Sequence, residues 1–225
     1  MLAWLGDLLF PALCIGCQRR GVALCAACRA ELPRLPSAVC ARCASLRQPG
    51  RACRGCTRLS PALASVRAVF AYDGAARTAV QQLKFRSARS LAPLLGELMR
   101  ADLADRPMRA DLVVPVPLAA GRLKDRGYNQ ASLLAEQVAL PVGGRLAPDV
   151  LARRDRPAQR TLSAARRLHN LDGTFTAPSP AAVRGRRILL VDDVLTTGAT
   201  LSAAADALAA AGATRVAGLV FARDL

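Results

Sequence analysis

The segment that most constrains the fold covers residues 188–201 and reads ILLVDDVLTTGATL. Its first four residues are apolar and form a run typical of a strand buried on both faces of a parallel sheet. Two adjacent acids, Asp192 and Asp193, follow at the carboxyl end of this strand. Small and hydroxylated residues then lead into an alanine-rich segment with high helix propensity. The order of strand, loop and helix predicts an α/β fold.

The loop after the two acids is suited to hold a phosphate. It consists of Thr196, Thr197, Gly198, Ala199 and Thr200. The first turn of a helix offers unpaired N–H groups and a partial positive charge, so backbone amides and threonine hydroxyls would hold a phosphate there. Gly198 lets the backbone approach such a ligand closely.

The two acids indicate that the ligand carries more than a phosphate. Two carboxylates repel a bare phosphate, but they can accept hydrogen bonds from vicinal hydroxyls one sugar away. A ribose 5-phosphate meets both requirements. The alternative is an ordinary turn between a strand and a helix, in which Asp192 and Asp193 only cap the helix.

Residues 192–200 resemble the signature of type I phosphoribosyltransferases. The resemblance implies that Asp192 and Asp193 bind the 2′- and 3′-hydroxyls of the ribose in phosphoribosyl diphosphate. It also implies that residues 196–200 bind the 5′-phosphate, and that Mg²⁺ accompanies the diphosphate. The expected fold is a type I phosphoribosyltransferase-like parallel sheet with helices on both faces.

Apolar periodicity supplies further elements for such a sheet. Gly212 is a good residue to end the helix that follows the phosphate loop. The last strand, helix and strand form one βαβ unit with the usual right-handed crossover. The predicted strands cover residues 65–72, 111–117, 187–192 and 214–222, and the predicted helices cover residues 74–85, 91–103, 130–140 and 200–211.

A basic loop is predicted after the strand at residues 111–117 and carries Arg122, Lys124 and Arg126. Ligands of open α/β sheets bind beyond the carboxyl ends of the strands, so this loop should face the two acids. Its three cations, together with Mg²⁺, would stabilise a departing pyrophosphate, while the acids hold the ribose as positive charge develops on it. The alternative is a solvated basic turn.

All eight cysteines lie in the first 56 residues as four C-x-x-C pairs: Cys14 and Cys17, Cys25 and Cys28, Cys40 and Cys43, Cys53 and Cys56. Two such turns complete the tetrahedral shell that structural zinc prefers, so eight thiolates predict two Zn²⁺ sites. Too little apolar material surrounds them for independent folding, and metal binding would supply the folding energy.

Sequential pairing of the four turns gives the sets Cys14/Cys17/Cys25/Cys28 and Cys40/Cys43/Cys53/Cys56, and interleaved pairing is the alternative. Disulfides, redox-active turns or an iron–sulfur cluster are the competing interpretations of the cysteines. The predicted domains are a double zinc ribbon with a short amino-terminal helix at residues 1–60 and an α/β domain at residues 61–225.

Several observations bear on location and on classes of chemistry. The first 13 residues lack the basic start of a signal peptide and predict a short amphipathic helix, and no run of eighteen apolar residues predicts a membrane span. We therefore expect a cytoplasmic protein. His169 is the only histidine, which disfavours triad catalysis and histidine-based metal sites.

The formal net charge of +16 raises the question of a nucleic-acid partner. Arginine supplies nearly all of this charge, because Lys84 and Lys124 are the only lysines. Zinc-bound thiolates would lower the charge to about +12, which is still strongly basic. Residues 153–170 contain six arginines and one aspartate and predict either a mobile flap over a polyanionic ligand or an exposed basic helix. Single-stranded DNA is thus a candidate partner.

The paired cysteines, together with the motifs QLKF, VPVPL, RLKDRGYNQ, QRTLSAAR and ILLVDDVLTTGATL, resemble the ComF/ComFC family over nearly the whole chain. The resemblance implies a double zinc ribbon before a phosphoribosyltransferase-like domain. It also implies a part in DNA uptake during natural competence, with other DNA-uptake proteins as partners. Purine-salvage phosphoribosyltransferases carry an acid where this chain has Thr196, which cannot handle the proton of a base. Purine salvage is therefore disfavoured.

Three functional hypotheses follow. In the first, the protein binds Mg²⁺-phosphoribosyl diphosphate and transfers its phosphoribosyl group, with Asp192, Asp193, Lys124 and Arg126 as the catalytic residues. In the second, it is a non-catalytic DNA-binding factor whose phosphoribosyl diphosphate pocket is a sensor or a relic. In the third, residues 1–60 are a protein adaptor. The acceptor nucleophile and the oligomeric state cannot be read from the sequence.

Overall fold

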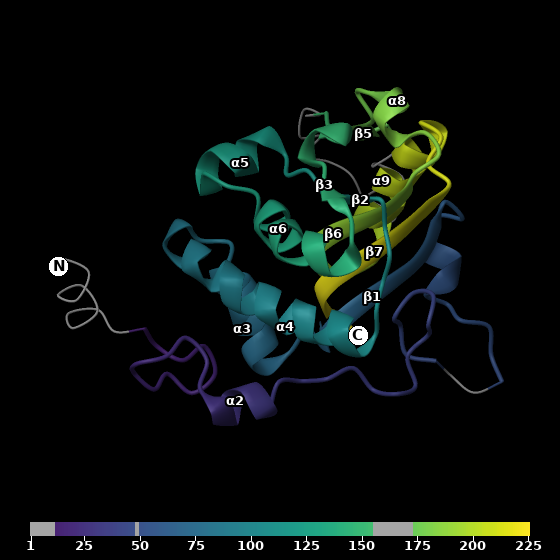
Figure 1. Ribbon diagram of the computed structural model, residues 1–225. Helices are drawn as coiled ribbons and strands as arrows, with labels where there is room; N and C mark the ends of the chain where they lie inside the picture. Colours follow the sequence, from purple (N-terminus) through teal and green to yellow (C-terminus); the bar gives the residue numbers. More distant parts are fainter. Residues whose placement is uncertain (1–11, 48–49, 155–172) are drawn as a thin grey trace, which may run out of the picture.

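The computed structural model describes residues 12–47, 50–154 and 173–225. Its centre is a five-stranded parallel sheet in the order β1-β7-β6-β2-β3 (Figure 1). The strands are β1 (Leu63–Ala71), β2 (Leu112–Pro115), β3 (Arg145–Leu146), β6 (Arg187–Leu195) and β7 (Arg215–Arg223). Strand β6 lies between β2 and β7, and its alternate side chains enter the cores on opposite faces of the sheet, which explains the apolar run that begins at Ile188.

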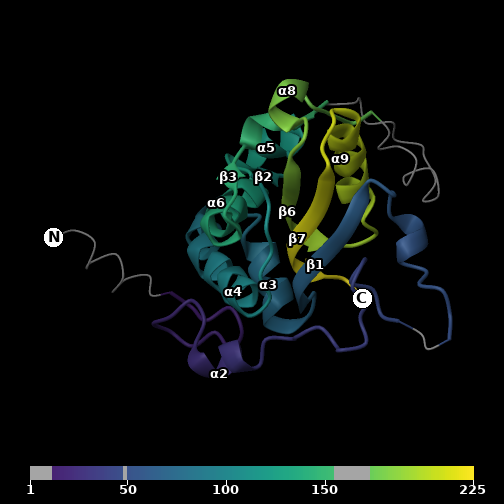
Figure 2. The ribbon, with the colours of Figure 1, turned by 45° about the vertical axis from the view of Figure 1, so that its right-hand side comes forward.

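Helices cover both faces of the sheet, as the sequence predicts (Figure 2). The helices α3 (Gly74–Gln82), α4 (Ala92–Asp105) and α6 (Gln130–Val142) pack on one face. On the other face, α9 (Ala199–Ala210) packs against residues of β1, β2, β6 and β7. Each layer encloses an apolar core, and the second core also includes Cys43 and Leu59 from the amino-terminal part of the chain.

The remaining elements are short. They are α2 (Ala26–Ala30), α5 (Ala120–Arg126), α8 (Pro180–Val183), the 3-10 turns η1 (Cys56–Arg58), η2 (Arg86–Leu91) and η3 (Pro148–Val150), and an antiparallel pair of β4 (Ala152–Arg153) and β5 (Phe175–Thr176). The predicted helix at residues 1–13 falls mainly outside the described residues, as do positions 155–170 of the arginine-rich segment.

Two predicted details are corrected. Strand β6 continues past the acids to Leu195, because β7 still pairs with it there: Asp192 lies opposite Val220 and Leu195 opposite Arg223. The predicted basic loop is instead the helix α5, which ends at Gly127 with a φ of 77°. That left-handed conformation suits glycine and stops the helix one residue after Arg126.

The cysteine-rich part runs along the free edge of β1. The backbone N–H of Ala71 donates to the carbonyl of Pro33 (2.7 Å), and the N–H of Val66 donates to the carbonyl of Arg42 (2.7 Å). Arg34 and Phe70 form an antiparallel bridge between these points. The segment before and around the second set of cysteines therefore protects the sheet edge.

Within the described residues, the helices are too short or too polar to cross a lipid bilayer.

Candidate functional site

The two acids lie at the carboxyl end of β6, and the chain itself holds both carboxylates in place. The backbone N–H of Asp193 donates to Oδ1 of Asp192 (2.8 Å), and the N–H of Val194 donates to Oδ1 of Asp193 (2.9 Å). Nζ of Lys84 lies 3.3 Å from Oδ2 of Asp193. This second oxygen is buried and has no hydrogen bond within the described residues, so it remains available to a ligand.

The environment of the acids disfavours two negative charges. Burial raises the pKa of Asp192 well above its ordinary value, and the neighbouring charge of Asp193 raises it further, while Lys84 opposes the shift. Hydroxyl donors or a cation near these carboxylates would lower the cost of that charge. Neither carboxylate caps α9, because the N-cap position of that helix is Gly198 and no side chain caps it.

The acids open onto a cavity of about 120 Å³. Basic side chains from three other parts of the chain surround it, which confirms that the segment after β2 faces the acids. Its lining residues are Lys84, Val116, Pro117, Leu118, Arg122, Arg126, Gln130, Arg153, Asp192, Asp193 and Thr200. An anionic group could thus contact several cations within reach of the carboxylates.

Of the three basic residues of α5 that the sequence predicts at the site, only two line the cavity. Arg122 and Arg126 line the cavity, and Nη1 of Arg126 donates to Oε1 of Gln130 at 2.9 Å. Lys124 is exposed on the same helix and is not among the lining residues. The helical spacing explains the difference, because positions 122 and 126 share a face and position 124 points elsewhere.

The phosphate loop, residues 196–200, connects β6 to α9. Gly198 precedes the helix with a φ of 84°, a conformation that suits glycine. Thr196 and Thr197 are exposed, and Thr200 reaches the cavity of the acids. The N–H of Ala199 contacts Oγ1 of Thr197 at 3.3 Å. The loop therefore presents its backbone and hydroxyls at the start of a twelve-residue helix.

Two residues that the sequence interpretation did not assign to the site contribute to it. Lys84 follows α3, and the hydroxyl of Tyr128 lies 2.5 Å from the carbonyl of Leu83 and 2.8 Å from that of Phe85, which holds the turn around Lys84. Arg223, at the end of β7, donates from Nη1 to the carbonyl of Thr196 at 2.6 Å. The available signals for Lys84 were the motif QLKF, which contains it, and the rarity of lysine, whereas only strand pairing reveals Arg223.

The cysteines form two separate four-sulfur groups, Cys14/Cys17/Cys25/Cys28 and Cys40/Cys43/Cys53/Cys56, in which all sulfurs lie within 4.8 Å of one another. This is the sequential pairing. Sulfur–sulfur distances of 3.8 Å for Cys17 and Cys25 and 3.5 Å for Cys40 and Cys56 suit a tetrahedral zinc, for which a Zn–S bond of about 2.3 Å gives an edge of about 3.8 Å.

The first group also shows how the backbone supports thiolates. The N–H of Cys25 donates to Sγ of Cys14 at 3.4 Å. Backbone N–H groups of Cys17 and Cys25 lower the pKa of the Cys14 thiol to about 6, which favours the metal-binding form. All eight cysteines are free thiols, and both groups therefore fit structural Zn²⁺ rather than disulfides.

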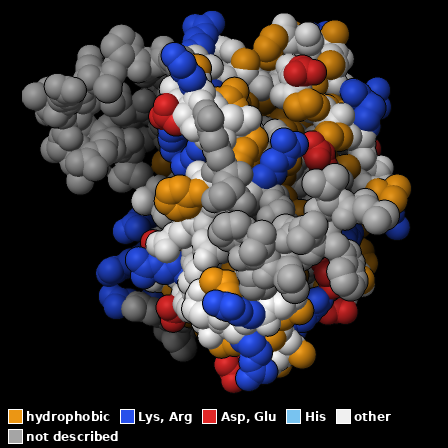
Figure 3. Space-filling view, turned by 90° about the vertical axis from the view of Figure 1, so that its left-hand side faces the viewer, with side chains coloured by type: hydrophobic (Ala, Val, Ile, Leu, Met, Phe, Trp, Pro, Cys, Tyr) orange, Lys and Arg blue, Asp and Glu red, His pale blue; other side chains and the backbone are white. Residues whose placement is uncertain are grey.

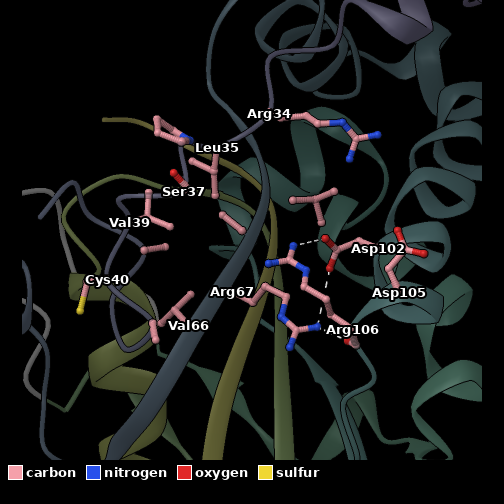
Figure 4. Close-up of a pocket in the computed structure, with 15 residues that line it drawn as sticks. Arg34, Leu35, Ser37, Val39, Cys40, Val66, Arg67, Asp102, Asp105 and Arg106 are labelled. Carbon is pink, nitrogen blue, oxygen red and sulfur yellow. Dashed lines mark hydrogen bonds and ion pairs between the residues drawn. The ribbon is translucent and has the colours of Figure 1, made fainter.

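A larger cavity of about 490 Å³ lies away from the acids, between residues 34–44, β1 and the end of α4 (Figure 4). One side is charged and the other is apolar, with Leu35, Val39 and Val66. Asp102 pairs with Arg67 (3.7 Å) and with Arg106, which fastens α4 to β1. Asp102, Arg67 and Arg106 therefore compensate one another's charge within this cavity.

Basic side chains are not confined to one region. On the face shown in Figure 3, Lys and Arg side chains are spread among apolar and neutral ones, with fewer acids. On this face the described basic side chains are therefore spread out rather than gathered in one patch.

Comparison with known proteins agrees with this architecture. Residues 123–224 match the description "Phosphoribosyl transferase domain", and residues 5–57 match "Double zinc ribbon domain". A solved glutamine phosphoribosylpyrophosphate amidotransferase of Bacillus subtilis has a TM-score of 0.42 and is 24% identical, over 59% of this chain and 26% of that one.

Curated relatives match most of the chain. Competence protein F of Haemophilus influenzae is 32% identical over 187 residues, which cover 80% of this chain and 81% of the relative. Competence protein ComFC of Bacillus subtilis is 30% identical over 192 residues, which cover 82% and 77%. The chain has two four-cysteine groups before a parallel α/β sheet, and both relatives are at least 30% identical to it over most of their length. The chain therefore belongs to the ComF family of competence proteins.

Proposed function

We propose that this protein binds Mg²⁺-phosphoribosyl diphosphate at the carboxyl end of β6 and transfers its phosphoribosyl group. The observation that carries the proposal is the convergence of three features on one cavity: a carboxylate pair, a helix-starting phosphate loop and a ring of cations. Asp192 and Asp193 would accept hydrogen bonds from the ribose hydroxyls, and residues 196–200 would hold the 5′-phosphate.

The chain's residues would act mainly through charge. Arg122 and Arg126 line the cavity and would stabilise the departing pyrophosphate, and Arg153 lies close enough to join them. Lys124, on the same helix, would reach the diphosphate only from the rim. The carboxylates would hold the ribose as positive charge grows at its anomeric carbon. The buried Oδ2 of Asp193, without a hydrogen bond of its own, fits a site that receives hydroxyls or a hydrated cation.

Mg²⁺, when bound with the diphosphate, would neutralise part of its charge and orient it. The oxygen-rich donor set suits this hard cation. Thr196 stands where purine-salvage enzymes carry the acid that handles a base. We therefore do not propose a purine as the acceptor.

Isothermal titration calorimetry of the zinc-loaded full chain tests the proposal. We expect binding heat for Mg²⁺-phosphoribosyl diphosphate and loss of that heat in the double variant Asp192→Asn, Asp193→Asn. The matched control is Glu136→Gln with Asp149→Asn, two exposed acids outside the cavity. Equal binding by both double variants would refute the site. If the expected binding is found, release of pyrophosphate in the presence of a pool of acceptors would distinguish transfer from binding alone.

The second candidate function is that of a DNA-binding factor in competence. It is favoured by the names of the relatives, "Competence protein F" and "Competence protein ComFC", and by the charge of +16. Single-stranded DNA affinity should then fall steeply with salt and weaken when Arg153, Arg154, Arg156 and Arg160 become glutamine, but stay indifferent to Asp192→Asn. Absence of DNA binding at low salt would exclude this function.

Eight free thiols in metal-binding groups fit a reducing compartment, and we propose the cytoplasm as the place where the protein acts, on DNA or with other DNA-uptake proteins. We also propose residues 1–60 and 61–225 as its two domains.

A further inference from the structure

A second basic cavity adjoins the phosphate loop. Its volume is about 190 Å³, and it shares no lining residue with the cavity of the acids. The loop contributes Thr200 to the cavity of the acids and Thr197 to this one. The other lining residues are Ser45, Leu46, Arg54, Gly55, Arg58, Arg223 and Leu225. The cavity therefore lies where the second cysteine group meets the phosphate loop and the end of β7.

The charged side chains that line this cavity are all arginines. Arg54 lies between Cys53 and Cys56 and Arg58 lies in η1, so the fold of the second cysteine group fixes where both are presented. Both arginines are exposed, and no acidic side chain is among the lining residues. Three guanidinium groups around one hollow, with the Thr197 hydroxyl beside them, favour an anion with several oxygens.

Arg223 supplies a second, independent indication. Its Nη1 donates to the carbonyl of Thr196 (2.6 Å) and its Nη2 to Oγ of Ser45 (2.8 Å). Its Nε is buried and has no hydrogen-bond partner within the described residues. A buried donor without a partner calls for an additional acceptor.

The cavity of about 190 Å³ has room for a tetrahedral phosphoryl group with some of its hydration. Planar guanidinium groups bind phosphate oxygens in a bidentate manner, which matches the residues present.

We propose that the cavity lined by Arg54, Arg58 and Arg223 is a second phosphoryl-binding site, next to the phosphate loop and formed in part by the second cysteine group. The phosphoryl group belongs either to free pyrophosphate or to the backbone of single-stranded DNA. An anion bound beside Arg223 competes with the carbonyl of Thr196 for the same guanidinium. Occupancy of this site therefore changes the affinity of the phosphate loop for its own ligand.

The test compares two double variants of the zinc-loaded full chain. Arg54→Gln with Arg58→Gln removes two charges from the cavity, and Arg19→Gln with Arg20→Gln removes two exposed charges from the first cysteine group. The probes are sodium pyrophosphate, by calorimetry, and a fluorescent twelve-residue oligothymidylate, by anisotropy at several salt concentrations.

We expect the cavity variant to weaken binding of at least one probe about tenfold at 0.1 M salt, and the control variant to change it far less. If DNA is the source, the slope of log affinity against log salt should fall by about 1.4, since each single-strand phosphate contact contributes about 0.7. If pyrophosphate is the source, its affinity should fall and the oligonucleotide's should not. Equal affinities of the two double variants for both probes would overturn the proposal.

This outcome is independent of the proposed transfer function. Binding of Mg²⁺-phosphoribosyl diphosphate is measured separately on the unmodified chain, so its failure would remove that function and leave the second site standing. The coupling between the sites is read from the affinity of the probe that the cavity variant weakens, measured with and without saturating Mg²⁺-phosphoribosyl diphosphate. A twofold or greater change in the unmodified chain, reduced in Arg223→Gln, is expected, and an identical affinity in both conditions would overturn the coupling.

Discussion

Gly198→Ala is the substitution whose cost the structure defines most closely. Gly198 has a φ of 84°, and a Cβ placed there would lie 2.3 Å from Cδ2 of Leu59. A left-handed backbone costs a residue with a side chain about 1–2 kcal/mol. The overlap adds to this, because Leu59 is 7% exposed and packed in a core and can yield only by leaving its preferred rotamer, at about 0.5–1.5 kcal/mol. The sum is about 1.5–3.5 kcal/mol.

A second glycine separates the cost of the left-handed backbone from the cost of the overlap with Leu59. Gly185 has a φ of 74°, and nothing lies within 4 Å of a Cβ built on it, so Gly185→Ala should cost only the backbone term of about 1–2 kcal/mol. In a Leu59→Ala background the overlap is absent, and the two glycine variants should then cost the same. The difference between them in the two backgrounds is a double-mutant cycle for the contact between the phosphate loop and Leu59.

The assay is thermal unfolding of the zinc-loaded chain. For a protein of this length about 1 kcal/mol corresponds to 2–4 °C, so Gly198→Ala should lower Tm by about 3–14 °C and Gly185→Ala by about 2–8 °C. The same Gly198→Ala protein should lose affinity for Mg²⁺-phosphoribosyl diphosphate, because the methyl group alters the loop backbone. The reasoning is refuted if Gly198→Ala is no more destabilising than Gly185→Ala, or if Leu59→Ala leaves the difference unchanged.

Three further predictions concern charge and metal. Because the pKa of Asp192 is raised in the folded protein, folding favours the protonated acid. Its stabilising contribution is complete below its ordinary pKa and is lost as pH rises through the raised value. Asp192→Asn should therefore be more stable than the unmodified chain at pH 7, with the gain vanishing near pH 4 in urea titrations. Lys84→Met removes the cation 3.3 Å from Asp193 and should cost about 1–3 kcal/mol at pH 7, and an unchanged urea midpoint would contradict this. Metal analysis should find two zinc ions in the unmodified chain and one in either Cys17→Ser or Cys43→Ser. Only Cys43→Ser should weaken binding of Mg²⁺-phosphoribosyl diphosphate, and equal affinities of the two variants would count against this reasoning.

Four of the five strands of the central sheet could be predicted from the sequence because they contain apolar runs, and β3 could not, since it has only two residues, Arg145–Leu146. Ile188 to Val191 and the alanine-rich helix after Gly198 show this plainly. The end of β6 could not be predicted, since polar residues such as Asp192 normally end a buried strand. Here pairing with β7 continues beyond them, and that pairing is a long-range contact with no local signal.

The site was predictable where chemistry is concentrated in one segment and unpredictable where it is assembled from several. Asp193 and Thr200 are close in sequence, and their proximity to the cavity follows from one strand and one helix. Lys84 reaches the same cavity from a turn about a hundred residues earlier, held by the hydroxyl of Tyr128. The helical form of residues 120–126 was missed because a basic, polar stretch with glycines at both ends has the composition of a loop.

The cysteine-rich part is more than an appendage to the phosphoribosyltransferase-like domain. Leu59 packs against Gly198, the N–H of Ser60 donates to Oγ of Ser202 in α9 at 3.0 Å, and Arg223 joins Ser45 to the carbonyl of Thr196. Each of these contacts ends on the phosphate loop or on the first turn of the helix it starts. Since metal binding supplies the folding energy of small cysteine-rich modules, loss of zinc from the second group would remove one wall of the loop. Zinc binding at the second group and ligand binding at the loop should therefore be thermodynamically linked, each strengthening the other.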